Sequence, residues 1–286
     1  MRLLITSDLH YNHARSKPLA QELIQQMNDA GGDALLVVGD TAAADGEALE
    51  ECLSLFNFKG PRLIIAGNHE LWTHREDSYA IWREELPRRV RALGWQWLED
   101  EPFIAGDVAI VGSVGWYDYS FAQPELGIPK RFYAAKVSPG AAERDPALAH
   151  LFASREDVSA SAMEVVARWN DGRFVKLHRG DEAFLDELLT RLGNQLDALS
   201  SAKQVIAAVH HLPFPQLLPP PHSAQWDFAK AYLGSTKIGE LLLKYPQISH
   251  VYCGHSHFPA EAQVGQIKGI NVGSGYRAKR FISLDL

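Results

Sequence analysis

Two pairs of metal-competent side chains follow short apolar runs near opposite ends of the sequence. Asp8-x-His10 comes after the first apolar run, and His255-x-His257 comes after the run at 248–253. Side chains two residues apart on an extended segment point the same way, so each pair can offer two ligands to one ion. Both pairs therefore indicate metal binding.

Three further candidates also stand where apolar runs end. Asp40 and Asn68 each follow a glycine, and His210 directly follows the run at 205–209. A glycine lets the backbone turn sharply and lets another group approach closely. The seven candidate metal ligands are Asp8, His10, Asp40, Asn68, His210, His255 and His257.

The chemistry of this set indicates the kind of metal centre. It mixes oxygen and nitrogen ligands without a thiolate, which suits manganese, iron, zinc, cobalt or nickel rather than calcium or a cysteine-bound zinc. Seven ligands are too many for one ion with an open position, but they fit two divalent ions that share a carboxylate. Two such ions bring four positive charges, whereas Asp8 and Asp40 contribute only two negative charges. The site should therefore attract a small anionic substrate, with metal-bound water as the nucleophile.

Alternating strands and helices would position these residues. The first third predicts strands at Arg2–Thr6, Leu35–Val38 and Leu63–Ala66, a helix at Leu19–Asp29 and another around 48–55. Short apolar runs separated by helices are typical of a parallel sheet covered on both faces. In such α/β sheets, ligands bind at the carboxyl ends of the strands, where the candidate ligands stand.

The remainder of the chain predicts further β-structure. Strands are expected at Val108–Val111, Val205–Val209 and Ile248–Cys253. The tail predicts antiparallel β-structure at Ile267–Val272 and Phe281–Leu284.

The segment from about 117 to 180 has only weak periodicity, and we interpret it as a cap-like insertion in a single domain of residues 1–286. It is expected to hold a helix at Ser159–Trp169 and a turn at Asn170-Asp171-Gly172. Asp181 is a candidate N-cap for the helix that follows.

Composition excludes several broad classes of protein. Hydrophobic residues make up 46% of the 286 residues, which supplies a sizeable core and excludes general disorder. The formal charge of −7 disfavours nucleic-acid binding as the main role. No targeting segment is visible, and no apolar run reaches the roughly 18 residues that span a membrane. A cytoplasmic protein with no membrane partner is expected, and its oligomeric state is left open.

Five motif blocks resemble those of the calcineurin-like metallophosphoesterases. They occur in that family's order along nearly the whole chain, and each stands at the end of a predicted strand. The blocks are Asp8-x-His10, Gly39-Asp40, Gly67-Asn68-His69-Glu70, His210 and Gly254-His255-Ser256-His257. The resemblance implies a β-sandwich flanked by helices, in four layers α/β/β/α, with the insertion as a cap.

The resemblance also implies a role for each matching residue. One ion would be held by Asp8, His10, Asp40 and His257. The other would be held by Asp40, Asn68, His210 and His255, with Asp40 as the bridge. His69 would be a catalytic residue that contacts the phosphoryl group or protonates the leaving oxygen.

Two blocks depart from the simplest pattern. The second block of the family often carries a later aspartate that orients the catalytic histidine, but Ala43 stands there, so Asp45 substitutes or His69 lacks that carboxylate. The fourth block presents His210 and His211 together. We favour His210 as the ligand, with His211 turned toward substrate or solvent.

Aromatic residues follow one of the predicted strands directly. Trp116 and Tyr117 could stack against a base or an aromatic leaving group, or they could anchor the cap in the core. Together with His211, they are the candidate substrate-binding residues.

The expected activity is metal-dependent hydrolysis of a phosphoester. Within this class we favour a phosphodiesterase acting on a small diester, with cyclic nucleotides among the candidates. Phosphomonoesterase and nucleotide pyrophosphatase activities use the same core and stay open, as does a non-catalytic scaffold built on the metal site. All seven ligands and His69 are present, which favours catalysis.

Overall fold

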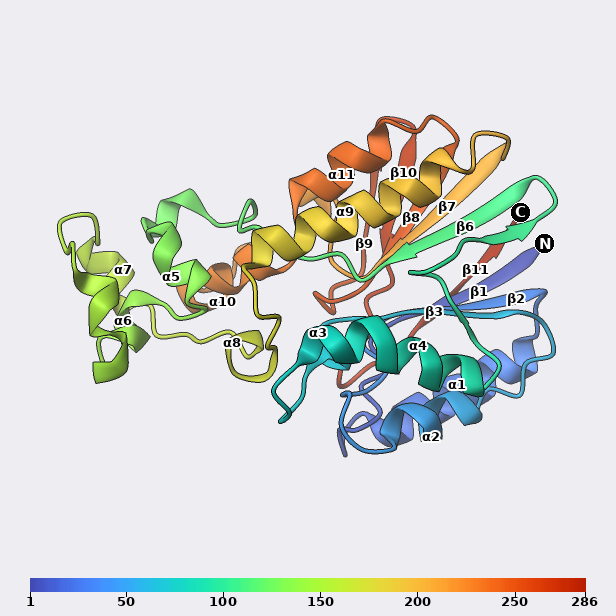
Figure 1. The fold of residues 1–286 in the computed structure, drawn as a ribbon, viewed down its shortest axis with the longest axis horizontal. Coiled ribbons are helices and arrows are strands. Elements are labelled where there is room, and N and C mark those ends of the chain that lie inside the picture. The colour runs from blue at the N-terminus through green and yellow to red at the C-terminus, as the bar shows by residue number, and fades with distance from the viewer.

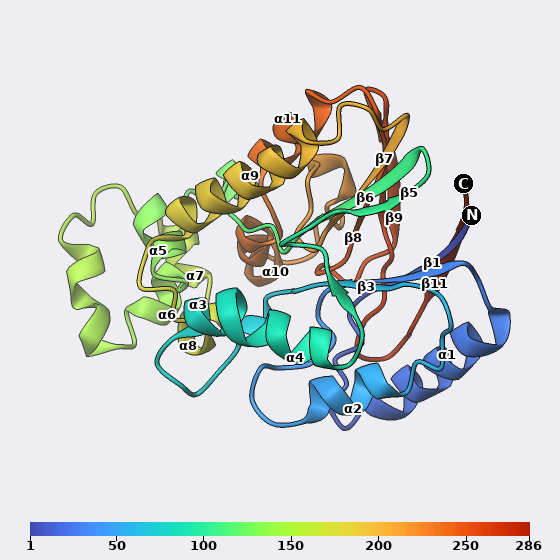
Figure 2. The same cartoon turned by 45° about the vertical axis from the view of Figure 1, so that its right-hand side comes forward.

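A computed structural model describes residues 1–286 as four layers, with two mixed β-sheets packed face to face between two layers of helices (Figure 1). Helices α9 (Asp181–Asp197) and α11 (Thr236–Leu243) cover one sheet. The other sheet is covered by α1 (Lys17–Ala30), α2 (Ala48–Ser54) and α4 (Leu86–Ala92), and the turned view in Figure 2 shows the same layers. The predicted α/β sandwich is confirmed.

The first sheet has the strand order β11-β1-β2-β3-β4. Strands β1 to β4 are parallel, and β11 closes the sheet antiparallel to β1, as expected for that part of the tail. Its strands are β1 (Arg2–Thr6), β2 (Ala34–Val38), β3 (Arg62–Ile65), β4 (Gln96–Trp97) and β11 (Phe281–Asp285).

The second sheet has the order β5-β6-β7-β8-β10-β9. Its edge strands β5 and β9 are antiparallel to their neighbours. Strand β10 pairs antiparallel with β9 but parallel with β8, so the expectation for this part of the tail is only half right. The strands are β5 (Phe103–Ala105), β6 (Val108–Ser113), β7 (Gln204–Val209), β8 (Ile248–Cys253), β9 (Ala260–Val264) and β10 (Ile267–Asn271).

Strand alternation divides the core between the layers. Leu3 and Ile5 of β1 belong to the apolar cluster between the two sheets, whereas Leu4 packs in the larger cluster under the helices. All five residues of β2 are buried, because helices cover one face of its sheet and the second sheet covers the other. This packing holds the carboxyl ends of the parallel strands of both sheets at one edge.

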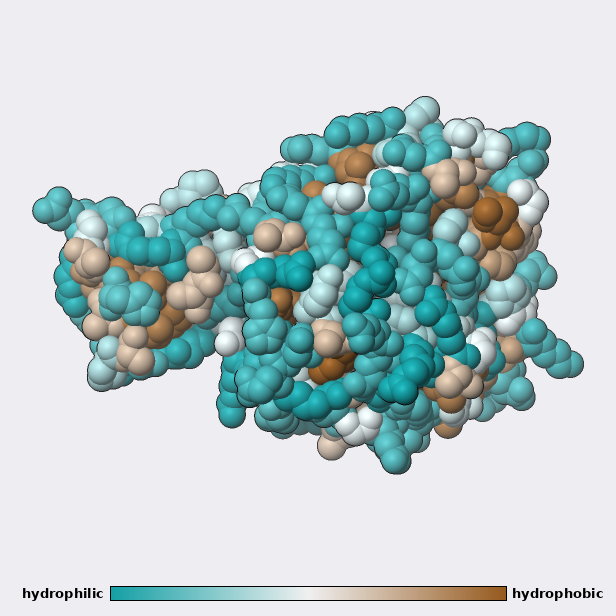
Figure 3. Space-filling model, viewed as in Figure 1, coloured by the Kyte–Doolittle hydropathy of each residue, from teal (hydrophilic) through white to brown (hydrophobic).

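The chain between β6 and α9 forms an arm that projects from the sandwich (Figure 3). The arm has a small apolar cluster of its own, formed by Phe132, Val137, Ala141, Ala142 and Leu151. Its helices are α5 (Lys130–Ala134), α6 (Pro139–Ala142), α7 (Ala160–Glu164) and α8 (Asp171–Phe174). Elsewhere the chain forms α3 (Ser78–Ala80) and α10 (Ala224–Ala229).

Two local predictions in and beside the arm are wrong. The helix expected at Ser159–Trp169 ends at Glu164, because the backbone beyond it pairs with 138–140 through Ser138 N–H to Ala167 O, 3.0 Å, and Gly140 N–H to Val165 O, 3.1 Å. Asp181 is the first residue of α9 rather than its N-cap. Its carboxylate instead accepts hydrogen bonds from Trp116 and Lys136.

None of the helices has the length and apolar character that crossing a membrane requires.

Candidate metal centre

Side chains from four strand ends, those of β1, β2, β7 and β8, meet in two clusters where the sheets face each other. One cluster holds Asp8, His10, Asp40 and His257, and the other holds Asp40, His210 and His255. Within each cluster, the candidate ligand atoms lie within 4.8 Å of one another. Asp40 belongs to both clusters, so the fold brings six of the seven predicted ligands together around one shared carboxylate.

The Asp40 carboxylate reaches toward both clusters. Its Oδ2 lies 3.4 Å from Nε2 of His210 and 3.7 Å from Nε2 of His10. Its Oδ1 accepts a hydrogen bond of 2.9 Å from the backbone N–H of His69, which fixes the rotation of the carboxylate. This geometry suits a bridging ligand between two cations.

The first cluster is assembled from both ends of the chain. Asp8 Oδ1 accepts a hydrogen bond of 2.9 Å from the backbone N–H of His255 and lies 3.4 Å from Nε2 of His257. The Nε2 atoms of His10 and His257 are 2.9 Å apart. Two imidazole lone pairs this close repel unless a proton or a cation lies between them.

The backbone at these positions is unusual. Five candidate ligands have positive φ angles: Asp8 (52°), His10 (44°), Asp40 (54°), His255 (67°) and His257 (55°). The paired ligands therefore do not project from extended segments, as their spacing suggested, but from left-handed turns just beyond the strands. Positive φ is uncommon in non-glycine residues and costs conformational energy, and such positions cluster at functional sites.

Two glycines make room for the ligands that surround them. A Cβ atom on Gly67 would lie 2.2 Å from Asp40 Oδ1 and 2.7 Å from Nε2 of His210. A Cβ atom on Gly254 would lie 2.3 Å from Asp8 Oδ2. Real Cβ atoms do not approach other atoms this closely, so only glycine fits at both positions.

Unpartnered polar atoms show that the site fits metal ions. Asn68 Oδ1 and His210 Nε2 are buried and have no hydrogen-bond partner. His210 Nδ1 lies 2.8 Å from the carbonyl of Val38, which turns Nε2 toward Asp40. In a metal-binding histidine, one ring nitrogen usually donates a hydrogen bond to a group such as a backbone carbonyl, and the second ring nitrogen faces the metal. The donor set of carboxylate, amide and imidazole groups suits two divalent cations.

Protonation in the clusters also suits ligation. Burial, helped by neighbouring histidines, holds the pKa of His10 and of His255 well below the usual value. Burial also opposes charge on His210 and Asp40, but their mutual attraction outweighs it. That attraction raises the pKa of His210 to about 10 and holds the pKa of Asp40 well below its usual value. Metal ligands need neutral imidazoles and ionised carboxylates, so the proton on His210 must leave when a cation binds.

Glu70 organises the turns behind the ligands, a role that sequence reasoning missed although Glu70 lies in a motif block. Its Oε2 accepts hydrogen bonds from the backbone N–H groups of Gly67 (2.7 Å) and Asp40 (2.9 Å). Its Oε1 accepts from the N–H groups of Thr41 (2.5 Å) and Ala42 (3.3 Å). One buried carboxylate thus ties together the turns after β2 and β3.

His69 faces the clusters from the start of a short 3₁₀ turn, His69–Leu71. Its Nε2 lies 3.9 Å from Asp40 Oδ2 and 3.5 Å from the hydroxyl of Tyr276. Its ring stacks on Trp72 with centroids 3.7 Å apart. Burial lowers the pKa of His69 to about 4.

No carboxylate orients His69 through its Nδ1 atom, which is buried without a partner. The alternative that Asp45 replaces the carboxylate missing at Ala43 is wrong. The Asp45 carboxylate instead interacts with Thr73, His74 and Arg75. The contact that restricts the His69 ring is instead its stack on Trp72.

Tyr276 is a further site residue that sequence reasoning missed. Its ring stacks on His10 at 4.3 Å and meets His257 edge-on at 5.0 Å. The sequence did hold a signal for it. The glycine-rich segment 273–275 follows β10, just as a glycine precedes the candidate ligands after β2, β3 and β8.

The structure corrects the three candidate substrate-binding residues. His211, Trp116 and Tyr117 are fully buried, and none of them lines the cavity above the clusters. His211 Nδ1 lies 3.0 Å from the carbonyl of Val114, and Trp116 donates a hydrogen bond to Asp181. These side chains pack in the core at the base of the arm, and His211 faces neither the cavity nor solvent.

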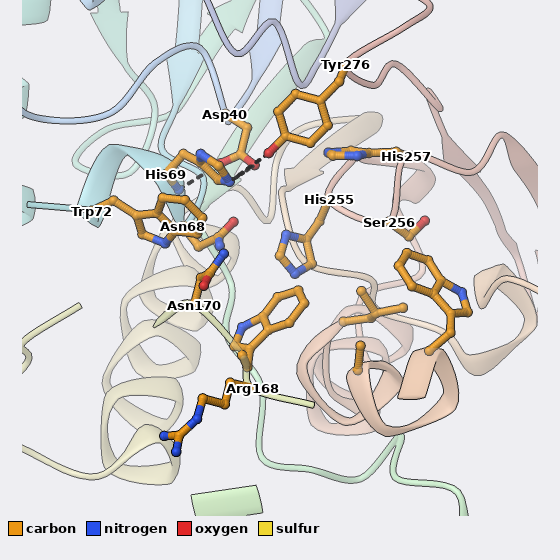
Figure 4. A pocket seen from close by; sticks show the side chains of 14 residues that line it. Asp40, Asn68, His69, Trp72, Arg168, Asn170, His255, Ser256, His257 and Tyr276 are labelled. Atoms are coloured by element: carbon orange, nitrogen blue, oxygen red, sulfur yellow. Dashed lines mark hydrogen bonds and ion pairs between the residues drawn. The ribbon is translucent and has the colours of Figure 1, made fainter. Parts of the chain in front are cut away.

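A cavity of about 370 Å³ opens directly above the two clusters (Figure 4). Its floor includes Asp40, Asn68, His69, His255 and His257. Its wall is largely aromatic and apolar, with Trp72, Trp169, Trp226, Leu233 and Tyr276. Arg168 stands at the cavity, but its side chain points away from the histidines in Figure 4 and pairs with Asp145 at 3.0 Å.

Comparison with known proteins agrees with this geometry. The family model described as calcineurin-like phosphoesterase matches residues 1–259. The acyl-carrier-protein phosphodiesterase PptH of Mycobacterium tuberculosis is 26% identical over 280 residues, which cover 94% of this chain and 76% of that protein. The crystal structure of the phosphopantetheinyl hydrolase PptH from the same organism superimposes with a TM-score of 0.69 and 21% identity, covering 96% of this chain and 89% of that one. A dimetal phosphatase from Danio rerio gives a TM-score of 0.56 and 14% identity, covering 99% and 91%.

We expect Gly67→Ala to abolish tight metal binding, because the new methyl group displaces the Asp40 carboxylate and the His210 ring. Titration calorimetry of metal-free protein with Mn²⁺ measures the effect. Gly180→Ala is the matched control, since a Cβ atom there meets nothing within 4 Å. Wild-type Mn²⁺ affinity in Gly67→Ala would contradict the assignment.

Glu70→Gln should lower the free energy of unfolding of the metal-free protein by about 2 kcal/mol or more, because the amide leaves buried N–H groups unpaired. Urea denaturation followed by circular dichroism measures this change. The control is Glu84→Gln on the exposed surface of the short π-helix Ile81–Glu85. Equal stability of the two variants would show that the Glu70 hydrogen bonds are dispensable.

Proposed function

The chain belongs to the calcineurin-like phosphoesterase family, and we propose that it hydrolyses phosphodiesters at a centre of two divalent cations. The observation that carries the proposal is the pair of His/Asp clusters that share Asp40 beneath an open cavity. A non-catalytic scaffold needs no such cavity above the clusters.

The residues divide into two ligand sets in this proposal. Asp8, His10, Asp40 and His257 hold one cation. Asp40, Asn68, His210 and His255 hold the other, with the unpartnered Oδ1 of Asn68 completing the cluster that already contains the remaining three. When bound, the two cations activate a water molecule and offset the negative charge of the phosphoryl group.

His69 is the proposed catalytic residue. It belongs to neither ligand set, and it lies between the shared carboxylate and the hydroxyl of Tyr276 on the cavity floor. Its ring can donate a hydrogen bond to a phosphoryl oxygen or to the leaving oxygen. The stack with Trp72 holds the ring plane in place during this contact.

The wall of the cavity supports a particular class of diester. Trp169 is held against Tyr232 with the rings 5° from parallel, while Trp226 is 42% exposed at the cavity. No unpaired cation faces the metal clusters from this wall to bind a second phosphate, because Arg168 pairs with Asp145. This wall suits an uncharged, extended organic group.

The pantetheine part of a phosphopantetheine arm on a carrier protein is such a group, and the similar protein PptH is named as an acyl-carrier-protein phosphodiesterase. We therefore place this chain's substrate among diesters with a pantetheine-like arm. The smaller cyclic nucleotides that the sequence suggested become the competing case in the experiment.

With Mn²⁺ added, we expect bis-p-nitrophenyl phosphate to be cleaved faster than p-nitrophenyl phosphate. His69→Ala should lower kcat on the diester by about 10²-fold or more while Mn²⁺ binding persists, because the ring contacts substrate rather than metal. Steady-state kinetics and calorimetry measure the two effects. Absence of turnover with Mn, Fe, Zn, Co and Ni alike would favour the scaffold.

Trp226→Ala should raise the KM for a holo acyl carrier protein about fivefold, as expected for about 1 kcal/mol of lost apolar contact, with little change for bis-p-nitrophenyl phosphate. Mass spectrometry of the carrier protein follows loss of the arm. Ile104→Ala, at an exposed apolar position on β5, is the control. Faster cleavage of 3′,5′-cyclic AMP than of the carrier protein would reverse the substrate assignment.

A further inference from the structure

Asp171 is a buried carboxylate in the arm that accepts hydrogen bonds from four different side chains. Its Oδ1 accepts from Nδ2 of Asn68 at 2.9 Å and from Nε1 of Trp72 at 2.6 Å. Its Oδ2 accepts from Nε1 of Trp169 at 2.7 Å and from the hydroxyl of Tyr117 at 3.0 Å. An ionised carboxylate can accept about four hydrogen bonds, whereas an asparagine oxygen can accept two.

The contact with Asn68 decides which end of that amide faces the metal clusters. With Nδ2 held by Asp171, Oδ1 is left buried and without a partner. A flipped amide would place its oxygen against the carboxylate oxygen of Asp171, and the two acceptors would repel. The orientation of Asn68 therefore depends on a residue 103 positions away in the arm.

The other contacts of Asp171 lead to the same site. Trp72 stacks on His69, and Trp169 lines the cavity with its ring 5.8 Å from that of His255. The Asp171 carboxylate thus binds the candidate ligand Asn68, the ring of Trp72 that stacks on His69, and Trp169 in the cavity wall.

We propose that Asp171 is a positioning residue of the metal centre, which presents Asn68 Oδ1 to one of the two divalent cations. The arm is then part of the metal site and not only its cover. This inference rests on the dimetal centre of the proposed function, but metal binding tests it without any measurement of hydrolysis.

A purely structural role predicts a different outcome, and the chain offers a matched control. Asp181 is also buried and accepts hydrogen bonds from side chains at the base of the arm, namely Trp116, Tyr119 and Lys136. It contacts none of the candidate ligands. Asp181→Asn therefore disturbs the same region without touching the metal centre.

Titration of metal-free protein with Mn²⁺ separates the two roles. Asp171→Asn should weaken one of the two Mn²⁺ sites by about 10- to 100-fold, the usual effect of losing a partner that orients a ligand. Asp181→Asn should leave both affinities within about twofold, even though thermal unfolding shows that both variants are destabilised. Wild-type affinity at both sites of Asp171→Asn would overturn the proposal.

A double-mutant cycle with Asn68→Ala tests whether the effect passes through Asn68. In the Asn68→Ala background, Asp171→Asn should cause no further loss of Mn²⁺ affinity. An equal loss with and without Asn68 would show that Asp171 acts through general packing, which contradicts the proposal.

A measurement on the unmutated chain covers the case in which Asp171→Asn does not fold. In ¹⁵N-labelled protein, the side-chain NH₂ signal of Asn68, assigned by its absence in Asn68→Ala, should be protected from exchange and should shift when Zn²⁺ is added. Rapid exchange, or no shift at saturating Zn²⁺, would refute the proposed role.

Discussion

One shared carboxylate is the constraint on which the whole site depends. Asp40 faces His10 on one side and His210 on the other, so the two clusters exist as a pair only while this side chain reaches both. Two hydrogen bonds fix its position. Asp40 Oδ1 accepts one from the backbone N–H of His69, and the backbone N–H of Asp40 donates the other to Glu70. The missing side chain of Gly67 leaves the space that the carboxylate occupies.

Much of the fold and most of the clustered candidate ligands could be predicted because they are local features of the sequence. Short apolar runs predict strands, and the polar residue after each run marks the sheet edge where ligands gather. The number of ligands predicted a shared carboxylate, and the resemblance to the family implied that Asp40 is the residue that supplies it. The left-handed turns that present Asp8 and His257 could not be seen, because spacing does not reveal the sign of φ.

The residues that were missed, or given the wrong role, are set by tertiary packing. Asp171 approaches Asn68 only after the arm folds back onto the sandwich, and no spacing records that contact. Trp116 follows a strand end as the ligands do, but it turns into the core and pairs with Asp181. The helix expected through Trp169 is shortened because extended pairing within the arm competes with it.

Five of the clustered residues have positive φ angles, and this backbone conformation lowers stability at the positions that the site needs. Each such residue costs on the order of 1 kcal/mol that glycine would not, although Asp and His tolerate this conformation better than most residues. A library of variants selected only for thermal resistance would therefore drift toward glycine or asparagine at Asp8, His10 and Asp40. The same library selected for turnover would keep them, so the two selections would diverge first at these turns.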